Sequence, residues 1–161
     1  MTDNNLIGID DNWPFDLGVG IISGLFFVAF YASTSISMGI PAPIYIQSVG
    51  NIVNFFAGLS VVCLLASICE ESIMAAILYI TNEVSNEVVA VILTSIAFAA
   101  LHWQVYGEAM MGAYVGAFLF RIVASVLMLS TKSLIPSMVM HAMVNGYLYL
   151  ESEQLLSVGG A

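Results

Sequence analysis

The sequence predicts an all-α fold, a polytopic membrane bundle of about five transmembrane helices, and three observations lead to this prediction. The chain of 161 residues is 60% hydrophobic and only 8% charged, and its mean hydropathy is +0.99. Its apolar residues form long runs, close to the roughly 20 residues that cross a hydrocarbon core as a helix. The runs lack the alternation of polar and apolar residues that marks a strand of a membrane barrel. These properties are typical of an integral membrane protein.

The chain divides into one bundle with two polar ends. We expect a polar, acidic N-terminal segment over residues 1–16, a transmembrane bundle over 17–150 and a polar C-terminal tail over 151–161. The acidic residues outside the apolar runs, Asp16 among them, are expected to solvate the membrane-exposed ends and loops. The apolar runs that define the expected helices are 17–38, 52–80, 87–103, 109–130 and 134–150.

The first expected helix, over residues 17–38, carries two local signals. Gly20 and Gly24 are four residues apart, a spacing that lets two membrane helices approach closely. Pro14 lies just before this run, and proline is favoured at the start of a helix because its ring already holds the helical φ angle. We therefore expect this helix to begin near Pro14 and to pack tightly against a neighbour.

The later expected helices carry similar signals. Asn86 precedes the third helix as a plausible N-cap, and Glu87 adds a favourable negative charge in its first turn. Gly112 and Gly116 give the fourth helix a second close-packing face. Pro136 stands in the first turn of the fifth helix.

Two adjacent carboxylates, Glu70 and Glu71, interrupt the apolar run over 52–80. A charged side chain that faced lipid would cost roughly 3 kcal/mol. Ionisable groups in membrane helices therefore normally face the interior of the bundle and mark a functional site. Neighbouring residues on a helix point about 100° apart, so only one of the pair can point directly at a common site. The two carboxyl groups could share a proton, one anionic and the other neutral.

Both histidines of the chain also lie in expected membrane helices. Phe98 and His102 are four residues apart, as are His141 and Asn145, and residues four apart share one face of a helix. We therefore expect acid, imidazole and amide side chains from the second, third and fifth helices to meet in one buried polar pocket. The alternative for each histidine is a structural role with its hydrogen bonds satisfied in the core.

These groups resemble, in order, the motifs of the CPBP intramembrane proteases, which include CAAX-processing and bacteriocin-processing enzymes and the Abi proteins. The family pattern is EExxxR, then FxxxH, then HxxxN, on separate membrane helices. The similarity covers about residues 60–150. It implies an intramembrane endopeptidase in which the catalytic residues are Glu70, Glu71, His102, His141 and Asn145, with Phe98 and Arg121 as auxiliary residues.

The chain departs from this pattern at the arginine of the first motif. That arginine would fall at Ala75, while Arg121 stands in the fourth helix where the family often has a glycine. One hypothesis is that Arg121 reaches into the pocket and supplies the missing positive charge. The alternative is that its side chain extends to the membrane surface or pairs elsewhere. The chain is also shorter than many relatives, so a second copy in a homo-oligomer could complete the pocket.

The resemblance implies that Glu70 activates a water molecule for attack on a substrate peptide bond, with Glu71 tuning it. His102 would act as a base or orient the water, and His141 with Asn145 would donate hydrogen bonds to the developing oxyanion. No cofactor is required on this interpretation, which we favour. Alternatively, Glu70, His102 and His141 could hold zinc with one coordination position open.

Partners are predicted only by class. We expect membrane lipid and a membrane-associated peptide or protein substrate, and no nucleic acid, because a net charge of −9 with two basic residues opposes phosphate binding. Two other functions stay open: a catalytically inactive relative acting as a membrane binding or immunity protein, and a small proton or ion carrier. Lys132 lies in the expected turn between the fourth and fifth helices. Basic residues in short loops favour the cytoplasmic side of the cell membrane, so we expect this turn to be cytoplasmic. With five crossings, the N-terminus lies on the same side.

Overall fold

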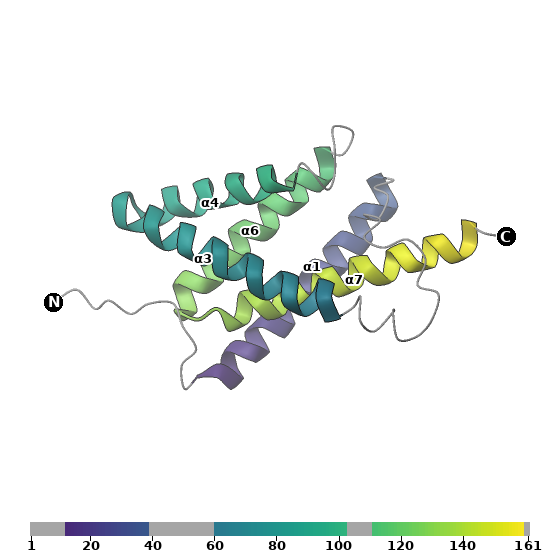
Figure 1. Cartoon of the computed structure of the whole chain (residues 1–161), viewed down its shortest axis with the longest axis horizontal. Helices are drawn as coiled ribbons and strands as arrows, with labels where there is room; N and C mark the ends of the chain where they lie inside the picture. The colour runs from purple at the N-terminus through teal and green to yellow at the C-terminus, as the bar shows by residue number, and fades with distance from the viewer. Residues whose placement is uncertain (1–11, 39–59, 103–110, 160–161) are drawn as a thin grey trace.

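The computed structural model describes residues 12–38, 60–102 and 111–159, and these residues form helices, with short turns at 85–86 and 132–134. The predicted all-α fold is confirmed for this part of the chain, with helical segments where the apolar runs placed them (Figure 1). Residues 52–59, 103 and 109–110 of the expected helices lie outside it. The elements are α1 (Trp13–Met38), a short π-helix η1 (Ser60–Ala66) that continues into α3 (Ser67–Val84), α4 (Glu87–Leu101), α6 (Met111–Thr131) and α7 (Ile135–Gly159).

The helices pack as two pairs bridged by α6 (Figure 1). One pair is α1 and α7, which lie along each other, and the other is the hairpin of α3 and α4. α6 packs against α4 and also contacts α7, and α3 contacts α7. The core lies where these helices meet and includes Phe27, Met74, Phe98, Ala117, Phe120, Met140 and Val144.

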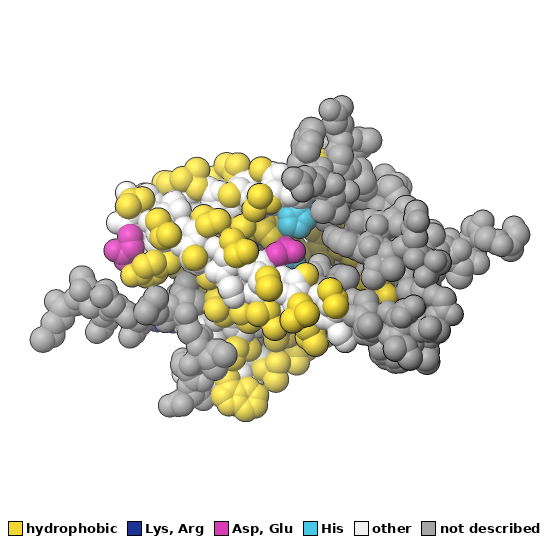
Figure 2. Space-filling model, viewed as in Figure 1, with side chains coloured by type: hydrophobic (Ala, Val, Ile, Leu, Met, Phe, Trp, Pro, Cys, Tyr) yellow, Lys and Arg dark blue, Asp and Glu magenta, His cyan; other side chains and the backbone are white. Residues whose placement is uncertain are grey.

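Within the described residues, three helical stretches are long and apolar enough to cross a membrane, namely Trp13–Ser33, Cys63–Val84 and Gly112–Thr131, and Glu87–Leu101 is apolar but shorter. Large hydrophobic side chains cover much of the outer surface, and Figure 2 shows one such face. In lipid this exposure has no hydrophobic penalty, because acyl chains are as apolar as leucine side chains.

Close packing of α1 against α7 depends on its glycines. A Cβ atom at Gly20 would lie 2.8 Å from the carbonyl oxygen of Pro136, and one at Gly24 would lie 2.5 Å from the sulfur of Met143. Gly116 on α6 is similarly close to the Tyr31 ring, with 2.9 Å to the hydroxyl oxygen. The predicted close-packing role is confirmed at these three positions.

Helix starts follow the expected signals. The side chain of Asn86 accepts a hydrogen bond from the Val89 amide at 3.1 Å, which confirms it as the N-cap of α4. Pro14 and Pro136 are each the second residue of their helix, α1 and α7. The turn into α7 contains Lys132, whose φ of 55° lies in the left-handed region.

Two details near the ends of the bundle differ from the expectation. Helix α1 begins at Trp13, beside the expected start at Pro14, but Asp16 in its first turn is buried, with 2% of its surface exposed, rather than solvating a membrane-exposed end. A carboxylate is favoured there by the N-terminal end of the helix dipole. Helix α7 continues to Gly159, past the expected end at residue 150, because Glu, Gln and Leu in this stretch are good helix formers and no proline interrupts them.

Candidate active site

The two adjacent glutamates of α3 have different environments. The Glu71 side chain is completely buried, whereas 39% of the Glu70 side chain is exposed. The helical twist turns them apart as expected, yet both carboxylates approach the imidazole of His141 on α7, each from the side of a different ring nitrogen. Figure 2 shows an acidic group and an imidazole side by side on an otherwise mostly hydrophobic face.

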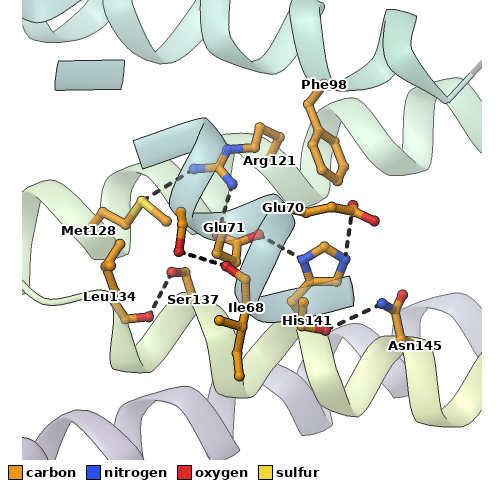
Figure 3. A network of polar contacts seen from close by, with 12 residues as sticks. Ile68, Glu70, Glu71, Phe98, Arg121, Met128, Leu134, Ser137, His141 and Asn145 are labelled. Atoms are coloured by element: carbon orange, nitrogen blue, oxygen red, sulfur yellow. Dashed lines mark hydrogen bonds and ion pairs between the residues drawn. The ribbon is translucent and has the colours of Figure 1, made fainter. Parts of the chain in front are cut away.

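Glu71 lies between a guanidinium and an imidazole (Figure 3). Its Oε2 accepts a hydrogen bond from Nη1 of Arg121 at 2.8 Å, and its Oε1 lies 2.7 Å from Nδ1 of His141. A guanidinium does not lose its proton in proteins, so its partner carboxylate is anionic and can only accept hydrogen bonds. Nδ1 of His141 therefore carries a hydrogen, which it donates to Glu71.

The Glu70 carboxylate faces the Nε2 atoms of both His102 and His141. Its Oε2 lies 3.7 Å from Nε2 of His141 and 3.9 Å from Nε2 of His102. Nδ1 of His102 donates to the backbone carbonyl of Phe98 at 2.8 Å, since a carbonyl oxygen can only accept. In the neutral rings, both Nε2 atoms that face Glu70 are therefore hydrogen-bond acceptors.

These acceptors converge without bonding to one another. Distances of 3.7 and 3.9 Å exceed a hydrogen bond, and Glu70 Oε2 is a buried atom with no hydrogen-bond partner in the described part of the chain. A buried acceptor left in that state is costly. The arrangement suits a species that brings hydrogens or positive charge to this position.

Two hollows lie beside the histidines and share Phe98 and His102 in their walls, and Glu70 lines the larger of them. The smaller has a cavity volume of about 20 Å³, enough for one water molecule, and the polar residues in its lining are Tyr31, His102, His141 and Asn145. The larger, of about 250 Å³, is lined by Glu70 and His102 and by the apolar side chains of Ile73, Met74, Phe98 and Leu101.

Aromatic rings hold the two imidazoles in place. The Phe98 ring lies 4.3 Å from that of His102 and 5.9 Å from that of His141, measured between centroids. Phe120 of α6 meets His141 edge to face at 5.0 Å. Both phenylalanines are buried, so the imidazoles have little room to rotate.

The structure brings together every predicted site residue. Helix α3 contributes Glu70 and Glu71, the end of α4 contributes Phe98 and His102, and α7 contributes His141 and Asn145. Arg121 points into the bundle rather than toward a membrane surface, and its side chain is completely buried. The catalytic roles of these residues stay predictions.

Sequence reasoning missed Ser67. Its hydroxyl accepts a hydrogen bond from the Asn145 amide at 3.3 Å, and its side chain is buried. Ser67 precedes Glu71 by four residues and so shares its helix face. The signal available in the sequence was a serine one helical turn before Glu71.

The zinc alternative finds no additional support in the geometry. Across the described residues, no group of three or more His, Cys, Asp and Glu side chains is arranged to hold a metal ion. Zinc thus stays a prediction that metal analysis tests.

A family model for Rce1-like type II CAAX prenyl endopeptidases matches residues 52–147, more than half of the chain. The chain belongs to this family. The matched range contains both glutamates, both histidines, Asn145 and Arg121, and it agrees with the CAAX-protease resemblance of the motifs. Family membership and the candidate spans together identify an integral membrane protein. Comparisons with curated proteins and with solved structures found no match.

Proposed function

We propose that the chain is an intramembrane endopeptidase that hydrolyses a peptide bond of a membrane-associated protein or peptide with a water molecule activated by Glu70. Membership of a CAAX prenyl endopeptidase family supports the reaction class. The observation that carries the mechanism is the position of Glu70 Oε2 between the Nε2 atoms of His102 and His141. Acceptors around one position suit water, which donates two hydrogens.

In the proposed reaction, Glu70 takes a proton from water as the water oxygen attacks the substrate carbonyl carbon. The carbonyl oxygen becomes an oxyanion, which the amide of Asn145 stabilises as a hydrogen-bond donor. The carbon–nitrogen bond then breaks as Glu70 returns the proton to the leaving nitrogen. His102 orients the water through Nε2.

Glu71 supports His141 in this scheme. A carboxylate that accepts from Nδ1 of a histidine fixes its tautomer and stabilises the imidazolium when Nε2 gains a proton. His141 can then take the second proton of the reacting water, while Glu70 keeps the first for the leaving nitrogen, and the imidazolium can donate to the oxyanion. Because Glu71 already pairs with Arg121, the positive charge of Arg121, rather than a proton shared with Glu70, balances Glu71.

The lining of the larger hollow beside Glu70 indicates which class of substrate would fit there. Its walls are apolar apart from Glu70 and His102, so it suits a hydrophobic segment of a membrane-anchored peptide. The matching family is described as type II CAAX prenyl endopeptidase, and a prenylated C-terminal peptide is therefore the first substrate to test. Leader peptides and membrane-anchored regulators form the rest of the panel.

The test is cleavage of this panel by purified protein in lipid vesicles. We expect Glu70→Gln to lower kcat by roughly a hundredfold or more, the usual contribution of a general base. Glu83→Gln is the matched control, because Glu83 lies on the same helix but is exposed near its end. Equal loss in both variants, or full activity in Glu70→Gln, would contradict the proposed mechanism.

The other function classes predict different outcomes. If folded parent protein cleaves no peptide of the panel yet captures one of them, the binding or immunity alternative holds. If vesicles instead show proton flux that stops in Glu70→Gln, the carrier alternative holds. Zinc retained at one ion per chain in the parent and lost in His141→Ala would replace the metal-free mechanism by the zinc version.

For the cellular location, we infer a multi-pass protein of the cell membrane with a cytoplasmic N-terminus. Three candidate spans support the multi-pass arrangement. The basic residue Lys132 in the turn between α6 and α7 supports a cytoplasmic side for that turn.

A further inference from the structure

Arg121 occupies a prepared position inside the bundle. Its side chain is completely buried, and each of its three nitrogens has a partner: Nη1 donates to Glu71 at 2.8 Å, Nε donates to Ser125 at 3.2 Å, and Nη2 lies 3.3 Å from the sulfur of Met128. The Phe98 ring lies 5.8 Å from its guanidinium carbon. A buried charge is tolerated when it is paired and hydrogen-bonded in this way.

Ala75 of α3 is buried near this position. It follows Glu71 by four residues and so shares its face of α3, and it is buried in one cluster with Met128, the residue that Nη2 of Arg121 contacts. A long side chain at residue 75 would compete with Arg121 for the space beside Glu71. A guanidinium beside Glu71 can therefore be supplied either by residue 75 of α3 or by residue 121 of α6.

We propose that Arg121 is a positioning residue that acts through Glu71 and His141, and that it replaces from α6 the arginine expected at residue 75 of α3. The proposal deepens the proposed function and rests on it for the activity readout. Arg121 holds Glu71 as an anionic acceptor, Glu71 holds the hydrogen of His141 on Nδ1, and Nε2 of His141 is thereby kept as an acceptor facing Glu70.

The experiment compares two variants with the parent. Arg121→Met keeps an unbranched side chain about as long as the apolar stem of arginine and removes the guanidinium with its charge. The exchange variant, Ala75→Arg with Arg121→Ala, has the same composition as the parent and moves the guanidinium to α3. Lys132→Met is the control, because it removes the other basic residue of the chain, which is exposed. Thermal unfolding in detergent shows whether each variant is folded.

The first readout is the tautomer of His141, from the nitrogen-15 shifts of histidine-labelled protein. The chain has two histidines, so a His102→Gln variant assigns the signals. We expect a single Nδ1–H tautomer in the parent and in Lys132→Met, a mixture in Arg121→Met, and return of the single tautomer in the exchange variant. A merely structural role for Arg121 would leave the tautomer unchanged in any folded variant.

The second readout is peptide cleavage. We expect Arg121→Met to lower kcat about tenfold or more, with KM nearly unchanged, because a misplaced tautomer impairs chemistry rather than binding. The exchange variant should recover most of this loss. If the parent cleaves nothing, the proposed function fails while the tautomer still tests Arg121.

Three outcomes would overturn the proposal. One is a folded Arg121→Met protein with the parent tautomer. Another is a folded exchange variant with a mixed tautomer. The third is an exchange variant that does not fold, because the proposal holds that the two positions are equivalent. If Arg121→Met itself does not fold, the exchange variant is compared directly with the parent.

Discussion

Ser67 shows how one hydroxyl can support the site without touching a substrate. It accepts a hydrogen bond from the Asn145 amide at 3.3 Å and so restrains the rotation of the amide proposed to stabilise the oxyanion. We expect Ser67→Ala to lower kcat about fivefold, because a hydrogen bond of this kind contributes about 1 kcal/mol. Steady-state cleavage kinetics measure this, and KM should change little.

The control for Ser67 is on the same helix. The hydroxyl of Ser72 donates to the Ile68 carbonyl one turn earlier and is exposed, so Ser72→Ala should leave kcat unchanged. A Ser67→Ala enzyme with parental kcat would show that Asn145 is held by its other surroundings.

The residue scale also shows where sequence reasoning ends. Glu70, His102 and His141 could be found because their motifs use spacings that place side chains on one helix face. The partner of Arg121 could not, because Glu71 is 50 residues away and their meeting depends on how α6 crosses α3. The same holds for Ser67 and Asn145, which are 78 residues apart. Sequence spacing left two alternatives for Arg121, a side chain that enters the pocket and one that extends to the membrane surface or pairs elsewhere. Only the packing of the helices distinguishes them.

At the scale of elements, the contact of α1 with α7 depends on Gly20. A Cβ atom there would lie 2.8 Å from both the Pro136 carbonyl oxygen and the Val139 Cβ, and neither can move without shifting the backbone of α7. We expect Gly20→Ala to lower the free energy of unfolding by roughly 1–3 kcal/mol, the usual cost of overpacking. Reversible unfolding in mixed detergent micelles measures it.

Gly18 provides the matched control one half-turn earlier. A Cβ atom at Gly18 would meet nothing within 4 Å, so Gly18→Ala should be neutral or slightly stabilising, because alanine is the better helix former. Equal destabilisation by both substitutions would mean that glycine flexibility, rather than helix proximity, matters in α1.

The elements themselves were largely predictable, and their ends were not. Long apolar runs and the Asn86 cap placed the helices, because hydropathy and capping are local properties of the sequence. The end of α7 differs from the expectation because polar residues there continue a helix that was expected to stop at residue 150. Asp16 is buried despite its charge, which composition alone did not indicate.

At the scale of the whole molecule, the bundle implies a definite topology. Figure 1 shows the start of α1, the α3–α4 turn and the α6–α7 turn toward one end of the molecule, and the end of α7 toward the other. If the helices cross the membrane, these two turns share a side, and the positive-inside bias of Lys132 makes that side cytoplasmic. The end of α7 then lies on the opposite side.

Cysteine labelling tests this topology in intact cells. In a chain with Cys63 and Cys69 replaced by alanine, single cysteines are introduced at Ser85, Ser130 and Ser157, and a membrane-impermeant maleimide is applied before and after permeabilisation. Ser85 and Ser130 are exposed near the two turns, so we expect Ser85→Cys and Ser130→Cys to react only after permeabilisation, and Ser157→Cys to react in intact cells. Labelling of the first two from opposite sides would contradict this topology, because α4 and α6, which lie between them in the chain, could not both cross the membrane. Labelling of both from outside would keep the bundle and reverse its orientation, since one lysine supplies only about 1 kcal/mol of electrostatic preference at a membrane surface.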